Sequence, residues 1–352
     1  MKYIKITLLL ILASSFLLAG CSGSLLQVRS WPGMAVDGEL LYAASGTGVF
    51  AVRLNDGGLD WRYPVEADNK KTFFADPLLV DGMLAIGDYK NTFYGLDAAT
   101  GVEQWQHEGT RGQYVAGAAA LDDMIFVPSG DHLLYAFNMD GVEQWTFETD
   151  EPLWGGVAVN GSKVYLPVMD WAVYALDAKS GKEVWKVDLA GAVVSAPALG
   201  EDGTLYVSSL GKSVYAIDAE RGSILWRYDT SDGVWASPTL HEGVIYVGDA
   251  SGNFYAIDAA RGQGLWQLDL GGTVVGSAAI YPEGLFVGTE TGDLLAISLD
   301  GKKQWTRSVE GKLYATPIVT EDRIVAAVTD GERLLIAWDL QGNEIWTFEQ
   351  PK

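Results

Sequence analysis

The sequence of 352 residues is long enough for one large domain or two ordinary ones, and 48% of its residues are apolar. These apolar residues are spread evenly along the chain, which argues against an intrinsically disordered protein. The formal net charge of −22 argues against nucleic acid and an anionic membrane surface as main partners, because like charges repel.

The first twenty residues predict a signal peptide. "MKYIK" supplies a short positive region, and "ITLLLILASSFLL" is an apolar run too short to span a membrane comfortably. The run leads into "LAGC", which resembles a bacterial lipobox, in which Cys21 becomes the lipid-bearing first residue of the mature protein. A plain secretory signal peptide with a chance cysteine is the alternative.

A lipid on Cys21 would hold the protein at a membrane and would leave no thiol for a disulfide, since Cys21 is the only cysteine. We therefore expect a signal peptide over 1–20, a lipidated tether over 21–29 and a folded domain over 30–350. Ser22 follows the cysteine, which resembles lipoproteins that are sent to the outer membrane. We expect an envelope protein at the outer membrane, facing the periplasm where the host has one, and otherwise at the outer face of the cell membrane.

A repeat of about forty residues organises the rest of the chain. In each unit a glycine stands four residues before a tryptophan. The tryptophans are Trp61, Trp105, Trp145, Trp185, Trp226, Trp266, Trp305 and Trp346. The glycines are Gly57, Gly101, Gly141, Gly181, Gly222, Gly262, Gly301 and Gly342. Self-similarity at this period predicts a propeller or a solenoid.

Each repeat unit has the pattern of four β-strands. Short runs rich in Val, Ile and Tyr alternate with turn sequences such as "EDG", "HEG" and "ETGD". In the sixth unit the sequence predicts strands over 235–240, 244–249, 253–259 and 265–270. A four-stranded sheet cannot bury both faces alone, so we expect the units to stack and the last to close onto the first.

Glycine, aspartate and tryptophan have separate predicted roles in the turn between the third and fourth strands. Gly181 and its equivalents are expected to adopt positive φ, which glycine does at little cost. The expected acceptors of backbone N–H groups in these turns are Asp97, Asp177, Asp218 and Asp258. The tryptophan is expected to fill the wedge between neighbouring sheets.

The turn sequence resembles a known family. "GLDAATGVEQW" from Gly95 and "ALDAKSGKEVW" from Ala175 match the tryptophan-docking repeat of the pyrroloquinoline quinone (PQQ)-type propellers. The first, third, seventh and eighth units keep Gly and Trp without the full Asp turn. The resemblance covers roughly 30–350 and implies an eight-bladed β-propeller with four antiparallel strands per blade. Together with the lipobox, it resembles the BamB-like outer-membrane assembly lipoproteins.

The last unit departs from the pattern of that family. It includes its own outer strand, in "IWTFEQ", whereas in BamB-like chains the N-terminus donates that strand. The ring is expected to close either by packing between blades or by an edge strand from "LLQVRS", residues 25–30.

The sequence offers no recognisable catalytic set. The same propeller family includes quinoprotein dehydrogenases, which resemble one another in a Ca²⁺ site and often an adjacent-cysteine disulfide, and this chain has one cysteine. Its three histidines, His107, His132 and His241, fall in different units without zinc-site spacing. We expect a protein that is not an enzyme and binds no cofactor or metal.

An aromatic column is the predicted binding feature. Aligning the units places Phe74, Tyr114, Trp154, Val194, Trp235, Val275 and Tyr314 at one point before the first strand. Trp171, in a neighbouring turn, is expected on the same face. These rings either seal the channel mouth or form an exposed patch for a partner. Asp88, Asp131 and Asp170 are expected to give that patch an acidic rim.

Three functions remain open at this point. The first is a non-catalytic envelope lipoprotein that binds envelope or outer-membrane proteins, with a BamB-like role in their assembly. The second is a ligand-sensing or polysaccharide-binding lipoprotein, whose rings stack on sugars. The third is a PQQ-dependent dehydrogenase.

Overall fold

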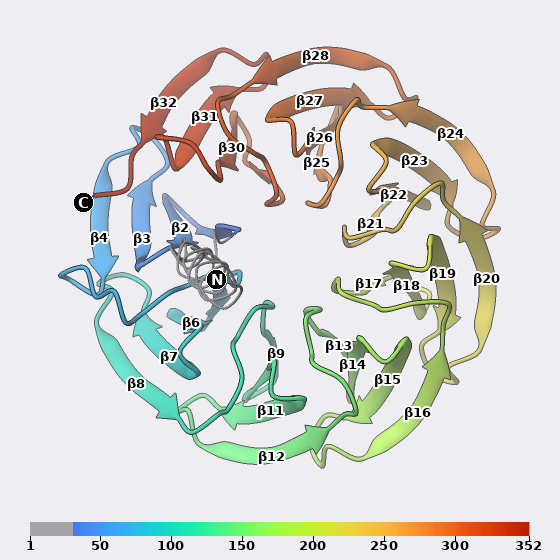
Figure 1. Cartoon of the computed structure of the whole chain (residues 1–352), viewed down its shortest axis with the longest axis horizontal. Coiled ribbons are helices and arrows are strands. Elements are labelled where there is room, and N and C mark those ends of the chain that lie inside the picture. Colours follow the sequence, from blue (N-terminus) through green and yellow to red (C-terminus); the bar gives the residue numbers. More distant parts are fainter. Residues whose placement is uncertain (1–30, 352) are drawn as a thin grey trace, which may run out of the picture.

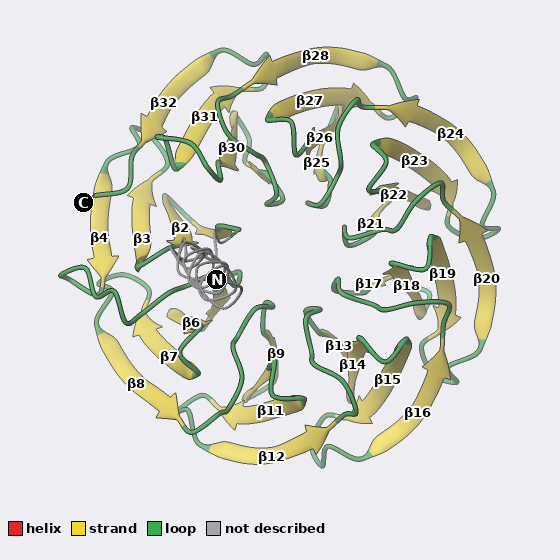
Figure 2. Ribbon diagram, viewed as in Figure 1, coloured by secondary structure: helices red, strands yellow, loops and turns green. Residues whose placement is uncertain are grey.

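The computed structural model describes residues 31–351, which form a ring of eight four-stranded antiparallel sheets around a central channel (Figure 1). No helix occurs in this part of the chain (Figure 2). The eight-bladed β-propeller predicted from the repeat is confirmed. The expected signal peptide, Cys21, the tether and the segment 25–30 lie outside the described residues.

Each sheet consists of four strands that are consecutive in the sequence, the first beside the channel and the fourth on the outer rim (Figure 1). The first four sheets contain β1 (Gly33–Asp37), β2 (Leu40–Ser45), β3 (Gly48–Arg53), β4 (Leu59–Tyr63); β5 (Leu78–Val80), β6 (Met83–Gly87), β7 (Thr92–Asp97), β8 (Glu103–Glu108); β9 (Ala119–Leu121), β10 (Met124–Pro128), β11 (Leu133–Asn138), β12 (Glu143–Glu148); β13 (Ala158–Asn160), β14 (Lys163–Val168), β15 (Ala172–Asp177) and β16 (Glu183–Asp188). The other four contain β17 (Ala198–Leu199), β18 (Thr204–Ser209), β19 (Ser213–Asp218), β20 (Ile224–Asp229); β21 (Thr239–His241), β22 (Val244–Gly248), β23 (Asn253–Asp258), β24 (Gly264–Asp269); β25 (Ala279–Tyr281), β26 (Gly284–Gly288), β27 (Asp293–Ser298), β28 (Lys303–Ser308); β29 (Ile318–Val319), β30 (Arg323–Ala327), β31 (Leu335–Asp339) and β32 (Glu344–Phe348).

The inner strands are shorter than the sequence predicts. In the sixth sheet the strand expected over 235–240 begins only at Thr239. Pro238 precedes it and has no N–H to donate to a β-ladder. The residues before it instead run along the channel wall as a loop.

The hydrophobic core is divided into eight clusters, each between two neighbouring sheets. Between the fifth and sixth sheets, for example, Tyr206 and Val214 pack against Ile245 and Tyr255. The strands in the middle of each sheet are buried on both faces, whereas most outer strands alternate between exposed and half-buried residues. Each sheet is therefore stabilised by its two neighbours.

The repeated tryptophans join each sheet to the next. All eight indole Nε1 groups donate a hydrogen bond of 2.7–3.1 Å to a main-chain carbonyl of the following sheet. The acceptors, in order, are Ala98, Met139, Ala178, Ala219, Ala259, Leu299, Leu340 and Leu54. The apolar ring thus fills the wedge while its polar N–H is satisfied.

The repeated glycines make room for these rings. Gly222 has φ +72°, and a Cβ added there would lie 2.7 Å from the Trp185 ring of the preceding sheet. Seven of the eight glycines face an indole in this way. Gly342 is the exception, because the Arg307 guanidinium lies against it. The glycines are therefore required both by the turn and by the docking of the indole.

The ring closes by packing of the eighth sheet on the first. The outer strand β32 belongs to the C-terminal unit itself, and its Trp346 donates to Leu54 O at 2.7 Å. Arg323 Nη1 donates to the same oxygen. Phe348 packs against Phe50 with ring centroids 5.8 Å apart. The first and last sheets therefore meet in the same way as any other pair.

Acid is expected to destabilise the propeller through the turn aspartates. The pKa of Asp177 is lowered, chiefly by the hydrogen bond from the Ser180 hydroxyl. The pKa of Asp258 is lowered, chiefly by the hydrogen bond from the backbone N–H of Arg261. A carboxyl group whose pKa is lower in the folded state than in the unfolded state stabilises the fold at pH values above its ordinary pKa. This stabilisation is lost as the pH falls below about 4 and the carboxylates become protonated. Urea unfolding between pH 6 and pH 3 measures the loss. The Asp177→Asn/Asp258→Asn variant should lose less stability across that range than the parent chain. Equal losses would contradict the role of these carboxylates.

Candidate functional site

A funnel at the centre of the ring is a concave site to which all eight sheets contribute. Its volume is about 720 Å³, and loops that lead into all eight sheets line it. These loops lie on the same face as the turns between second and third strands. In the fourth sheet, for example, Val193 N donates to Val168 O at the end of β14.

Each of these loops alternates between a buried and a funnel-facing residue. The buried residue packs in the seam, and its N–H donates to the turn of the preceding sheet. These buried residues are Phe73, Tyr114, Leu153, Val193, Val234, Val274 and Leu313. The next residue lines the funnel, which places Phe74, Val115, Trp154, Val194, Trp235, Val275 and Tyr314 on its wall.

Tyr114 is therefore not a funnel residue, contrary to the sequence prediction. It is fully buried, and its N–H donates to Asp88 O. Val115 occupies the funnel position in the third sheet. In an extended segment a shift of one residue exchanges the two faces, so a one-residue error in the alignment turned a core residue into a surface residue.

The other predicted rings differ in exposure. Trp154 is 47% exposed, Trp235 and Tyr314 are half-buried, and Phe74 is buried against Tyr89 with ring centroids 3.9 Å apart. Trp171 is 59% exposed in the turn between β14 and β15, but it does not line the funnel. The structure thus brings four predicted rings to the funnel lining, and Trp171 is not among the lining residues.

Sequence reasoning missed Trp31, which the structure places in the funnel. Its ring lies 5.5 Å from Tyr314 and 6.3 Å from Trp235, nearly perpendicular to the latter. Trp31 stands just before the first strand of the first sheet, as the column residues do in theirs. This position before the first strand could have identified Trp31 from the sequence, but the aligned column of residues began only at the second unit.

A charged pair holds Tyr314 at the funnel wall. The Tyr314 hydroxyl donates to Glu290 Oε1 at 2.9 Å and accepts from Lys312 Nζ at 3.0 Å. The hydrogen bond from Tyr314 lowers the pKa of Glu290, and burial raises the pKa of Tyr314. The lysine and the glutamate also form an ion pair, so their charges compensate each other.

The expected acidic rim is largely turned inward. Asp88 is 1% exposed, and its carboxylate accepts hydrogen bonds from Thr92 N and the Tyr94 hydroxyl. Asp131 and Asp170 likewise accept from the tyrosine hydroxyl of the following strand. Because Asx-type acceptors stabilise tight turns, these carboxylates serve the fold.

Asp76 is the one charged side chain among the described residues that line the funnel. Its Oδ1 accepts a hydrogen bond from Met34 N at 3.1 Å. The side chain is exposed to the funnel, but the surrounding wall partly desolvates its carboxylate, and this raises the pKa of Asp76. The hydrogen bond from Met34 N acts in the opposite direction and lowers the pKa by less. The sequence did not single it out.

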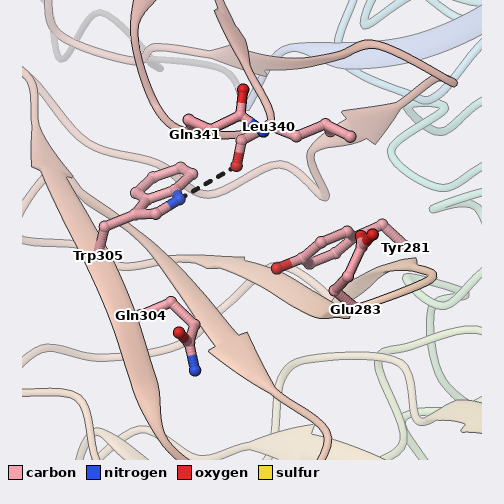
Figure 3. A pocket seen from close by; sticks show the side chains of 6 residues that line it. All are labelled: Tyr281, Glu283, Gln304, Trp305, Leu340 and Gln341. Atoms are coloured by element: carbon pink, nitrogen blue, oxygen red, sulfur yellow. Dashed lines mark hydrogen bonds between the residues drawn. The ribbon is translucent and has the colours of Figure 1, made fainter.

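A second concave region lies at the seam between the seventh and eighth sheets. Tyr281, Glu283 and Gln304 line it beside Trp305, whose indole donates to Leu340 O (Figure 3). It is built from the same docking contact as the other seams and brings few elements together. The funnel is therefore the candidate functional site.

A family model described as outer membrane protein assembly factor BamB matches residues 22–138, 130–279 and 269–352. The chain belongs to the BamB family. The crystal structure of BamB from Moraxella catarrhalis has a TM-score of 0.75 and 18% sequence identity to this BamB-family chain, and the similarity covers 87% of this chain and 96% of that one. The shared fold is thus nearly complete in both.

Propellers of other proteins also resemble this BamB-family chain. The serine/threonine-protein kinase AfsK of Streptomyces griseus is 29% identical over 183 residues, which cover 49% of this chain and 23% of the kinase. The quinohemoprotein alcohol dehydrogenase ADH-IIG of Pseudomonas putida is 30% identical over 131 residues, 37% of this chain and 14% of the enzyme. Its structure has a TM-score of 0.73 at 13% identity, covering 92% of this chain and 76% of that one. The chain spans less than a quarter of the length of these curated relatives.

The funnel does not fit the quinone cofactor of such enzymes. PQQ is an anion with several carboxylates, and no lysine or arginine belongs to the described funnel lining. Its only charged group, Asp76, would repel the cofactor.

Within residues 31–351, no group of three His, Cys, Asp or Glu side chains is placed to hold a metal ion. The same part of the chain contains no helix with the length and hydrophobicity needed to cross a bilayer.

Proposed function

We propose that this BamB-family chain is a non-catalytic scaffold of the cell envelope that binds protein partners during outer-membrane protein assembly. The observation that carries the proposal is the funnel, where Trp31 and Trp154 are exposed and Trp235 and Tyr314 are half-buried among small side chains, and no catalytic set converges among the described lining residues. Aromatic rings are enriched at protein interfaces, and exposed aromatic patches often mark them.

The location belongs to the same proposal. We propose that a lipid on Cys21 anchors the chain in the envelope, at the outer membrane facing the periplasm where the host has one. Membership of the BamB family and the lipobox-like "LAGC" support this location. Crosslinking in the native membrane, followed by mass spectrometry, would name the partners.

The Trp154→Ala/Trp235→Ala variant tests the funnel as the docking surface. We expect it to capture at least tenfold less of the crosslinked partner in a pull-down, because aromatic side chains dominate interface energetics. The melting temperature should stay close to that of the parent chain, since Trp154 is exposed and Trp235 is half-buried. Trp171→Ala is the matched control, because this exposed tryptophan lies outside the funnel lining. Unchanged capture by the double variant would remove the funnel from the proposal.

Sugar binding is the second candidate, and the exposed Trp154 favours it because such a ring can stack on a saccharide. Binding on a glycan array without any crosslinked protein would support this candidate over the scaffold. Oxidation of alcohols or sugars by the chain after loading with PQQ and Ca²⁺ would contradict the non-catalytic role.

A further inference from the structure

In every other sheet where a residue can be aligned with Asp76, that residue is uncharged. The equivalent residues on the funnel wall are Gly117, Gly156, Ala196, Ser237, Ser277 and Thr316. In the eighth sheet, Thr316 Oγ1 accepts a 3.0 Å hydrogen bond from Ser277 N of the preceding sheet. This bond is comparable to the one that Asp76 accepts from Met34 N. A neutral acceptor such as Thr316 can therefore bond to the neighbouring sheet, and three sheets have glycine or alanine here, so the contact between sheets does not need a charge.

The charge of Asp76 has no compensating cation nearby in the structure. Among the described residues, only Oδ1 of its carboxylate has a hydrogen-bond partner, and no lysine or arginine shares the funnel lining. Lys312, close to the wall, is paired with Glu290. An anion in a concave, partly desolvated site on a chain of net charge −22 creates a potential that attracts cations.

Aromatic rings share the funnel with this carboxylate. Trp31, Trp235 and Tyr314 form one corner of the funnel, and the Trp31 and Trp235 rings meet at 89°. Trp31 is two residues from Gly33, whose backbone packs against Ala75 O and the Asp76 Cα. Aromatic faces and an anion that line one concave site are groups that recognise ammonium compounds, since the ring faces are electron-rich.

We propose that the funnel binds an organic cation, with Asp76 supplying the negative charge and the rings of Trp31, Trp235 and Tyr314 supplying aromatic faces for its ammonium group. Gly117 leaves room beside the carboxylate, because a Cβ there would lie 3.6 Å from the Asp76 Cβ. A free alkylammonium compound and a lysine side chain share this chemistry. The inference does not depend on the scaffold role, because the site is defined by the ammonium group alone.

Titration calorimetry of the detergent-purified full chain tests the site with three probes. Choline represents a free alkylammonium compound, the peptide Gly-Lys-Gly represents a lysine of a partner, and 3,3-dimethylbutan-1-ol is the neutral isostere of choline. We expect at least one of the two cations to bind at least tenfold more tightly than the alcohol. Binding by choline alone points to a small molecule, and binding by the peptide alone points to a protein partner. Equal binding of the alcohol, or no binding of either cation, would overturn the proposal.

Two variants separate the charge from the rings. Asp76→Asn keeps the acceptor for Met34 N and removes the charge, so it should weaken cation binding at least tenfold without lowering the melting temperature. Trp31→Ala should weaken binding about fivefold to tenfold, which corresponds to one cation–π contact. Trp171→Ala should bind as the parent chain does, because Trp171 lies outside the lining. Parent-like affinity in Asp76→Asn would show that the carboxylate takes no part.

Discussion

Replacing Trp226 by alanine is expected to lower the free energy of unfolding by about 3–5 kcal/mol, as other large-to-small core changes do. The indole packs in the seam between the fifth and sixth sheets, 5.9 Å from the Tyr206 ring, and donates to Ala259 O at 2.8 Å. The Gly262 turn covers its face. The substitution would therefore leave a cavity and remove the shorter of the two side-chain hydrogen bonds that Ala259 O accepts, the other being donated by the Tyr206 hydroxyl at 3.3 Å.

Chemical denaturation monitored by circular dichroism measures this loss. Trp171→Ala is the control, because removing an exposed ring from a turn should change stability by no more than about 0.5 kcal/mol. A near-zero effect of Trp226→Ala would mean that the indole contributes nothing to the seam. The double variant with Trp185→Ala should deviate from additivity, since β20 carries Trp226 and the turn that receives Trp185 lies in the same sheet.

The second large effect is expected from Gly222→Ala. Both the positive φ of +72° and the Trp185 ring, 2.7 Å from an added Cβ, oppose a side chain there. Gly243→Ala provides the matched comparison, because Gly243 has φ +76° and nothing within 4 Å of an added Cβ. Backbone strain of about 1–2 kcal/mol should be common to both variants. Overpacking against the indole should add about 1–3 kcal/mol only at Gly222.

The difference between the two unfolding free energies isolates the contact between glycine and tryptophan. Both variants can be measured by the same urea titration, with fluorescence reporting whether the Trp185 environment changes. Equal destabilisation of the two variants would show that the turn, and not the indole, requires glycine at position 222.

The fold could be predicted from sequence because the residues that determine the turn and the docking of the tryptophan lie close together within each repeat unit. Gly181, Trp185 and the Asp177 turn are local features, and all three have the geometry that the spacing implied. In the third and eighth units Asn138 and Asp339 stand closer to the glycine than the motif requires, and their side chains still accept backbone N–H groups of the turn, which the strict motif did not reveal. The closure of the ring could not be decided in advance, because it depends on contacts between residues as distant as Leu54 and Trp346.

The funnel was predicted less completely, for physical reasons. Loop residues that alternate between core and surface have no turn signal to fix their register, so Tyr114 was placed on the wrong face. The inward orientation of Asp88 depends on Tyr94, six residues away. Trp31 and Asp76 could not be recognised as funnel residues from the sequence, because they line one site only after the ring brings the first, second, sixth and eighth sheets together. Convergence of this kind is a property of the closed ring.

Within residues 31–351 no sheet borrows a strand from another part of the chain, since the four strands of each described sheet follow one another directly. The covalent link between one sheet and the next is therefore a single loop, and the eighth and first sheets make the tryptophan contact of Trp346 with Leu54 without such a link. The same architecture is compatible with a cyclically reordered sequence.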